Sequence, residues 1–125
     1  MYKRQEYKEG EEYATLYIGN EDVIEDVRVL AKGIYLTRDL VNSPASDMMP
    51  QDISHTMQEL SKEHKAKFTE IVGDDLLKEN FPTVHLVGRA SCHKPRLLEL
   101  NWGDKSAPKL TLIGKGVCFD AADWT

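Results

Sequence analysis

The spacing of the apolar residues changes along this chain of 125 residues, and that change most constrains its possible folds. From Val23 to Leu40 the apolar residues recur every three or four positions, which predicts an amphipathic helix. Proline disfavours a helical residue ahead of it, so this helix should end before Asn42-Ser43-Pro44. Helical spacing returns from about Pro50 to His64, where proline suits the first turn.

Other segments have the alternation or composition of strands, and they are separated by turn residues or helical stretches. Acidic residues at Asp74-Asp75 predict the start of a further helix. The apolar residues from Pro82 to Ser91 fit helical spacing and strand alternation equally well. Strands interleaved with helices predict an α/β fold. The expected strands are Tyr13–Ile18, Lys67–Val72, Leu97–Trp102 and Lys109–Ile113.

Charge and composition exclude several classes of protein. The formal net charge is −5 and no basic stripe is present, so we expect no nucleic-acid partner. No apolar run approaches the roughly 20 residues of a membrane span, and the charged N-terminal residues do not resemble a signal peptide. Two cysteines make no disulfide framework, which favours a cytoplasmic location.

The segment from Leu110 to Asp120 carries the strongest chemical signal. An apolar strand leads into Gly114-Lys115-Gly116, and Asp120 follows five residues after the lysine. Ligands in α/β sheets bind at strand ends, so this lysine and carboxylate could serve a metal ion or an anion. A simple turn with a solvated lysine explains the pattern equally well. The spacing does not fit a phosphate-binding loop of the Walker type.

The remaining candidate residues are scattered. Cys92 and His93 are sequence neighbours, but no second Cys/His pair stands at the spacing of a zinc site. All four histidines are therefore interpreted as structural or surface residues. Cys118 is expected to be a buried small hydrophobe.

Four motifs follow one another along the chain: Arg38-Asp-Leu-Val-Asn-Ser-Pro-Ala-Ser-Asp-Met-Met-Pro50, Val87-Gly-Arg-Ala-Ser91, Pro95-Arg-Leu97 and Gly114-Lys-Gly-Val-Cys-Phe-Asp120. Their residues and their order resemble the catalytic domain of the leucyl aminopeptidase (cytosol aminopeptidase) family. The first is similar to the Arg-Asp-Leu-Val-Asn-Thr-Pro-Ala-Asn signature that opens that domain, and the likeness covers residues 24–120. The expected architecture is a partial mixed sheet flanked by helices, the N-terminal portion of such a catalytic domain.

The resemblance implies a two-metal exopeptidase that releases N-terminal amino acids from peptides. Lys115 matches a lysine that binds one of two divalent ions, manganese or zinc, near the free amine of the substrate. Asp120 matches an aspartate ligand of the same metal pair. In the family the pair activates a bridging water and polarises the scissile carbonyl. Family members form hexamers, so a homo-oligomer is a possible assembly.

The chain departs from the family pattern directly after Asp120. The family continues Ser/Thr-Gly-Gly-Leu-Asp-Leu-Lys, whereas this sequence reads Ala121-Ala-Asp-Trp-Thr125. The catalytic lysine and arginine and most metal ligands of the family are thus not in this sequence, and no catalytic set is complete. We expect weak or no metal binding and no activity from this chain alone.

Two hypotheses explain the last five residues. Loss of one nucleotide from a gene that encodes the family motif can give Asp-Ala-Ala-Asp-Trp-Thr followed by a stop codon. The alternative is a designed boundary with vector-derived residues. The expected organisation is a linker or N-terminal domain remnant at 1–23, part of the catalytic domain at 24–120 and a non-family tail at 121–125.

Two other functions stay open for a chain of this kind. The first is a non-catalytic oligomerisation or interaction module, because a partial sheet would expose an edge and apolar surface. The second is a small-ligand or anion-binding domain that uses Gly114–Gly116.

Overall fold

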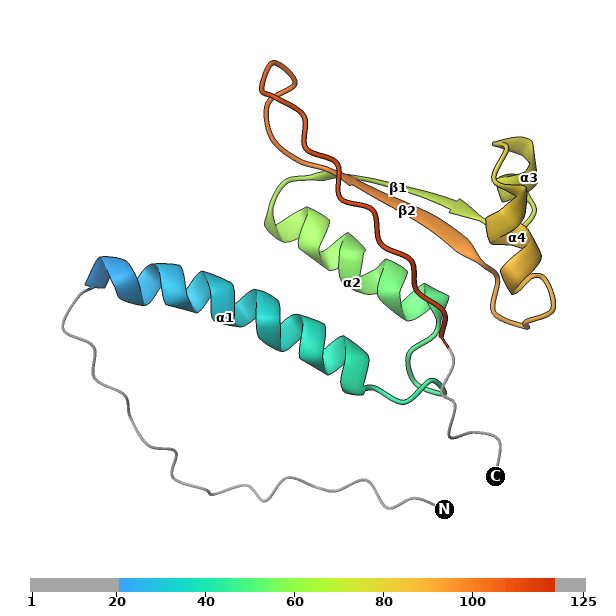
Figure 1. Ribbon diagram of the computed structural model, residues 1–125, viewed down its shortest axis with the longest axis horizontal. Coiled ribbons are helices and arrows are strands. Elements are labelled where there is room, and N and C mark those ends of the chain that lie inside the picture. The colour runs from blue at the N-terminus through green and yellow to red at the C-terminus, as the bar shows by residue number, and fades with distance from the viewer. Residues whose placement is uncertain (1–20, 119–125) are drawn as a thin grey trace. The chain divides into compact units, whose positions relative to one another are not determined.

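The computed structural model describes residues 21–118, with side chains from residue 23 onward (Figure 1). The chain divides into two compact units, Met1–Leu36 and Thr37–Thr125, and the boundary falls within the first helix. The described elements in chain order are α1 (Glu21–Asn42), α2 (Pro50–Glu63), β1 (Lys67–Val72), α3 (Asp75–Lys78), α4 (Pro82–Gly88) and β2 (Arg96–Asn101).

Helix α1 confirms the helix that the apolar spacing predicts, and it ends at Asn42, two residues before Pro44. The backbone N–H and the hydroxyl of Ser43 both donate to the carbonyl oxygen of Asp39, at 3.1 and 2.8 Å. These bonds satisfy one carbonyl that the last turn of a helix leaves without a partner. The stop before Pro44 therefore has a defined local cause.

Helix α2 matches its predicted bounds to within one residue. Pro50 occupies the first position, and the Asp52 carboxylate accepts a hydrogen bond from the backbone N–H of Met49 at 2.9 Å. After the helix, Lys65 adopts a positive φ of 53°. The backbone N–H of Ala66 then donates to the carbonyl of Ser61, five residues earlier, at 2.8 Å. This is the 6→1 hydrogen bond of a Schellman C-cap.

Strands β1 and β2 form a two-stranded antiparallel sheet in which Lys67 lies opposite Asn101 and Val72 opposite Arg96. Helix α2 packs against both strands (Figure 1). Side chains alternate between the two faces of a strand. The face towards α2 therefore carries Phe68, Glu70, Val72, Arg96, Leu98 and Leu100, and the other face carries Lys67, Thr69, Ile71, Leu97, Glu99 and Asn101.

The α/β class is confirmed, and the sheet of the described residues consists of this one antiparallel pair. The prediction of a strand at Lys109–Ile113 is wrong for the described structure, which shows no ladder there. Apolar alternation reports the preference of side chains, but a strand also needs a neighbouring backbone as hydrogen-bond partner. Residues 109–113 have the composition of a strand, but no neighbouring strand pairs with them among the described residues.

A turn and two short helices connect β1 to β2. Gly73 leaves β1 with a positive φ of 57°, and its N–H donates to the carbonyl of Pro95 at 2.9 Å. Helix α3 confirms the start expected near Asp74-Asp75. Helix α4 settles the ambiguous stretch as helical, with Pro82 in its first turn. Its last residue, Gly88, lies so close to Pro95 that an added Cβ would stand 2.5 Å from the proline Cβ.

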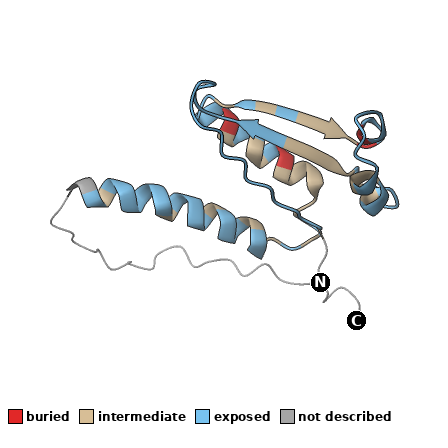
Figure 2. Cartoon of the chain, turned by 45° about the horizontal axis from the view of Figure 1, so that its top comes forward, coloured by how far each residue is buried: buried red, intermediate tan, exposed pale blue. Residues whose placement is uncertain are grey.

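The hydrophobic core of the described residues is small. Leu76 of α3 is fully buried, and the hydroxyl residues Ser54 and Ser61 of α2 are the buried polar ones (Figure 2). Within residues 21–118, no helix has both the length and the apolarity that crossing a membrane requires. Of the expected segment 1–23, residues 21–23 begin α1; the strand at Tyr13–Ile18 and the tail at 121–125 lie outside the described residues.

Candidate functional site

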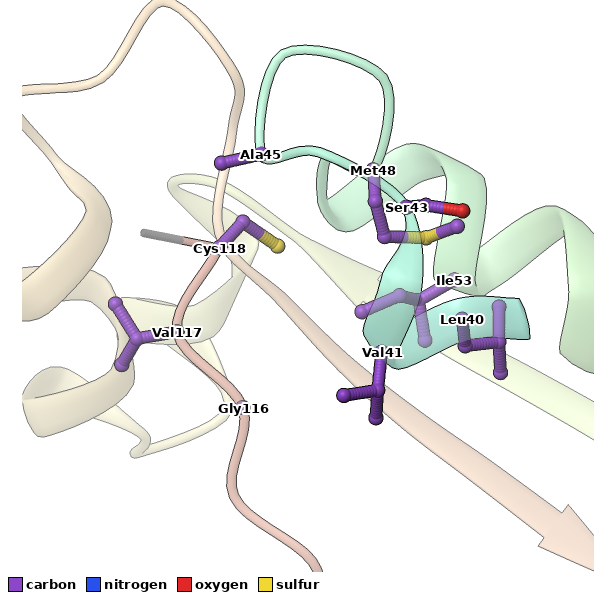
Figure 3. A pocket seen from close by; sticks show the side chains of 9 residues that line it. All are labelled: Leu40, Val41, Ser43, Ala45, Met48, Ile53, Gly116, Val117 and Cys118. Atoms are coloured by element: carbon purple, nitrogen blue, oxygen red, sulfur yellow. The ribbon is translucent and has the colours of Figure 1, made fainter. Parts of the chain in front are cut away.

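A cavity of about 370 Å³ brings two sequence motifs of the second unit together (Figure 3). One side comes from the end of α1, the loop after it and the start of α2. The other side comes from the extended segment that carries the Gly-Lys-Gly turn. The lining residues are Leu40, Val41, Ser43, Ala45, Met48, Ile53, Gly116, Val117 and Cys118.

Apolar side chains and polar atoms both contribute to the surface of this cavity. The Ser43 hydroxyl is already bonded to the Asp39 carbonyl, and the side chain of Cys118 points towards Met48 (Figure 3). Burial, and secondarily the charge of Asp52, raises the pKa of the Cys118 thiol, so the thiol stays protonated at neutral pH. The thiol therefore adds no negative charge to the cavity.

The two expected metal ligands are not brought together by the described residues. Lys115 lies exposed in the extended chain beside the cavity and makes no ion pair within residues 21–118. Asp120 lies outside the described residues. The described part of the chain also holds no group of three or more His, Cys, Asp or Glu side chains that could bind a metal ion.

The histidines and Cys92 occupy positions that fit their interpretation as structural or surface residues. Gln51 donates a hydrogen bond to Nδ1 of His93 at 3.1 Å, which connects α2 to the loop before β2. His85 of α4 contacts the carboxylate of Asp74 at 3.1 Å. Cys92 is exposed, and His55 and His64 are exposed as well.

A polar network that the sequence analysis does not predict lies between α2 and the sheet. The hydroxyl of Ser54 donates to Oε1 of Glu70 at 2.7 Å, and the Arg96 guanidinium donates to the same oxygen. These residues stand 16 and 26 positions apart in sequence. No local pattern relates them, so only the packing of α2 on both strands reveals the network.

The network keeps Glu70 ionised. Burial favours the neutral acid, but the hydrogen bonds from Ser54 and Arg96 and the charge of Arg96 outweigh it and hold the Glu70 pKa below its usual value. Arg96 Nε is buried without a hydrogen-bond partner among the described residues. The arrangement is that of a structural ion pair which fixes α2 to β1 and β2.

Comparison with known proteins finds the same family that the four motifs resemble. Residues 35–122 match the family description "Cytosol aminopeptidase family, catalytic domain". A probable cytosol aminopeptidase of Corynebacterium glutamicum is 32% identical over 102 residues, which make up 81% of this chain and 20% of that protein. Probable cytosol aminopeptidase 1 of Shewanella oneidensis is 31% identical over 84% of this chain and 21% of its own length.

The fold shows the same likeness. The crystal structure of the cytosol aminopeptidase from Coxiella burnetii superposes with a TM-score of 0.76 at 44% sequence identity. The superposition covers 81% of this chain and 22% of the Coxiella chain. The chain therefore spans about a fifth of the length of the relatives that it matches.

Proposed function

The chain belongs to the cytosol aminopeptidase family, and from this membership we propose that it supplies part of a metal-dependent aminopeptidase site. In this proposal Lys115 and Asp120 are ligands of two divalent ions. One observation carries it: the Gly114–Asp120 motif lies inside the matched region of the catalytic domain, 35–122. The cavity supports it, because the motif that opens the matched domain lies beside the one that ends it.

The proposed reaction of the whole enzyme is the release of N-terminal amino acids from peptides, in the cytoplasm, with manganese or zinc. The family relationship supports this reaction, and the description of the relatives as cytosol aminopeptidases supports the location. In the bound enzyme the two ions would supply an activated water and polarise the scissile carbonyl. The assembly proposed for the whole enzyme is a homo-oligomer.

The described residues by themselves do not fit a pair of metal ions. They contribute Lys115 as a donor, and they contain no cluster of carboxylate, histidine or cysteine ligands. Affinity for a divalent ion rises with the number of ligands and their preorganisation. We therefore propose weak or no metal binding by the isolated chain and derive no catalytic step from it.

The first test is an activity assay of the isolated 125-residue chain. We expect no release of leucine from a leucine-containing dipeptide in the presence of manganese or zinc. Release above a blank without protein that is lost in Asp120→Ala would overturn this expectation. Titration calorimetry with manganese checks the metal separately, because binding as tight as that of a complete site would contradict the proposal.

The second test places the chain in a complete catalytic domain. Residues 24–120 replace the matching segment of the Coxiella burnetii aminopeptidase, which is 44% identical. We expect the chimera to hydrolyse leucine p-nitroanilide, and we expect Lys115→Ala and Asp120→Ala each to lower kcat at least about 100-fold. The matched controls are Lys105→Ala and Asp104→Ala in the exposed loop, which should leave kcat within about twofold. Equal losses in test and control variants would contradict the assignment.

A further inference from the structure

Cys118 lies half-buried against the loop that joins α1 to α2. Its side chain points towards Met48, and three residues of this loop line the same cavity as Cys118 (Figure 3). Burial and, secondarily, the charge of Asp52 in the first turn of α2 raise the pKa of the thiol, so this carboxylate lies near it. Cys118 therefore connects the motif around Lys115 to the motif that opens the matched domain.

Hydrogen bonds fix the backbone of this loop, residues 43–49. The first residue of the loop is bonded to the last turn of α1. The carbonyl oxygen of Pro44 accepts hydrogen bonds from the backbone N–H groups of Asp47 and Met48, at 2.8 and 2.9 Å. The last residue of the loop donates its backbone N–H to the Asp52 carboxylate at 2.9 Å. Met48 therefore belongs to a hydrogen-bonded turn that can support a neighbouring segment.

Cys118 stands in the sequence between the two residues of the proposed site. Lys115 lies three positions before it and Asp120 two positions after it. Three residues of chain reach at most about 11 Å and two at most about 7 Å. The place at which Cys118 is held therefore limits where Lys115 and Asp120 can stand.

We propose that Met48 and Cys118 are positioning residues of the proposed aminopeptidase site. The hydrogen-bonded loop holds Cys118 through Met48, and Cys118 holds the backbone that carries Lys115 and Asp120. Both residues act through that backbone rather than on the substrate, and the inference rests on the proposed function. Displacement of a reacting group by about 1 Å can lower a rate about 100-fold, so a packing contact outside the site can change kcat.

Nuclear magnetic resonance on the 125-residue chain tests the contact without any activity. We expect a nuclear Overhauser effect between the Met48 methyl group and the Cys118 β-protons. We expect Met48→Ala to lower the backbone order parameter of Cys118 by at least about 0.2, because the segment loses its support. The matched control is Met57→Ala on α2, a half-buried methionine outside the cavity lining, which should leave that order parameter unchanged.

The chimera that carries residues 24–120 tests the consequence for catalysis. We expect Met48→Ala and Cys118→Asp each to lower kcat at least about tenfold, while the KM for leucine p-nitroanilide changes less than about threefold. Cys118→Asp puts a carboxylate near that of Asp52, and like charges repel. Cys118→Val keeps a small apolar side chain, and the cavity of about 370 Å³ has room for its extra methyl group. This variant should keep kcat within about threefold.

Two control variants separate loss of position from loss of stability. Met57→Ala removes a methionine side chain from the same helix layer, and Cys92→Asp places a carboxylate at the exposed cysteine. Both should keep kcat within about twofold. Thermal unfolding of every variant shows whether a change in kcat follows a change in stability, which a purely structural role would require.

Three results would overturn the inference alone. One is the lack of an Overhauser effect between Met48 and Cys118, and another is an unchanged order parameter at Cys118 in Met48→Ala. The third is an equal loss of kcat in the test and control variants of a chimera that still depends on Lys115 and Asp120. If Lys115→Ala and Asp120→Ala leave kcat unchanged, the proposed function fails, and the inference fails with it.

Discussion

The carboxylate of Glu70 makes the stability of this chain depend on pH. Its pKa in the folded chain lies below the ordinary value of 4.5, because hydrogen bonds from Ser54 and Arg96 outweigh the effect of burial. A lowered folded pKa contributes stability above the unfolded pKa, and that contribution is lost as pH falls through the folded pKa. We expect the free energy of unfolding in urea to fall from about pH 6 to about pH 3 and Glu70→Gln to reduce this slope.

The matched control is Glu99→Gln, on the exposed face of β2, where the carboxylate accepts a hydrogen bond from Asn101. This variant should keep the slope of the original chain. If Glu70→Gln left the slope of stability against pH unchanged, the Ser54–Glu70–Arg96 network would not lower the pKa of Glu70 in the folded chain.

The hydroxyl of Ser54 provides a second test of the same network. Ser54→Ala removes the donor at 2.7 Å from Glu70 and leaves a partly buried carboxylate with fewer hydrogen bonds. Because hydrogen bonds to charged groups contribute more than neutral ones, we expect a loss of about 1.5–3 kcal/mol in urea unfolding. Ser106→Ala in the exposed loop removes a similar bond to Asp104 and should cost less than about 0.5 kcal/mol. Equal losses would contradict the structural role of Ser54.

Gly88 is required by close packing against Pro95. An added methyl group would meet the proline ring at 2.5 Å, and the ring is rigid because it is closed onto the backbone nitrogen of Pro95. We expect Gly88→Ala to destabilise the chain by about 1–3 kcal/mol, measured by thermal or urea unfolding. Gly114→Ala is the control, because nothing lies within 4 Å of its added Cβ. A harmless Gly88→Ala would mean that α4 and Pro95 can separate freely.

Among the elements, α2 shows how local chemistry and packing cooperate. Pro50 and Asp52 mark its start in the sequence, and Lys65 terminates it in a left-handed conformation with φ of 53°. A side chain in that conformation is strained, whereas glycine adopts it readily. We expect Lys65→Gly to raise the free energy of unfolding by up to about 1 kcal/mol.

The control for this variant is Lys62→Gly, within the helical part of α2. Glycine in a helix interior costs about 1 kcal/mol, so this change should lower stability. If both variants lowered the stability equally, the Schellman C-cap would not be the dominant local feature.

The elements also show where sequence patterns fail. The helical spacing in α1 and α2 and the alternation in β1 were sufficient to place them. The stretch that became α4 was ambiguous because seven residues are too few for either period to stand out. The segment 109–113 has strand-type residues, but its state depends on a partner that local sequence does not specify.

For the molecule as a whole, the small core limits stability. Leu76 is the fully buried hydrophobic residue of the described chain, whereas its neighbour Leu77 is 49% exposed. We expect Leu76→Ala to cost about 2–5 kcal/mol, because it removes buried methyl groups and leaves a cavity. Leu77→Ala should cost less than about 1 kcal/mol. Urea unfolding followed by circular dichroism measures the stability loss of each variant. Equal losses would show that Leu76 is not the centre of the core.

The sequence by itself determined the class of this protein. Helical and strand spacing predicted the α/β class, and four ordered motifs identified the catalytic domain that the comparisons confirm. These features are readable because they depend on neighbours within a few positions. The ligand roles of Lys115 and Asp120 remain predictions, since Asp120 lies outside the described residues.

Only the tertiary structure decided which distant residues meet. It joined Ser54, Glu70 and Arg96 around one carboxylate oxygen, and it placed Cys118 beside Met48 in the lining of one cavity. It also left the strand-like residues 109–113 exposed and unpaired. Such contacts depend on how helices and strands pack, and no local spacing in the sequence encodes the partner of a buried charge or of a strand edge.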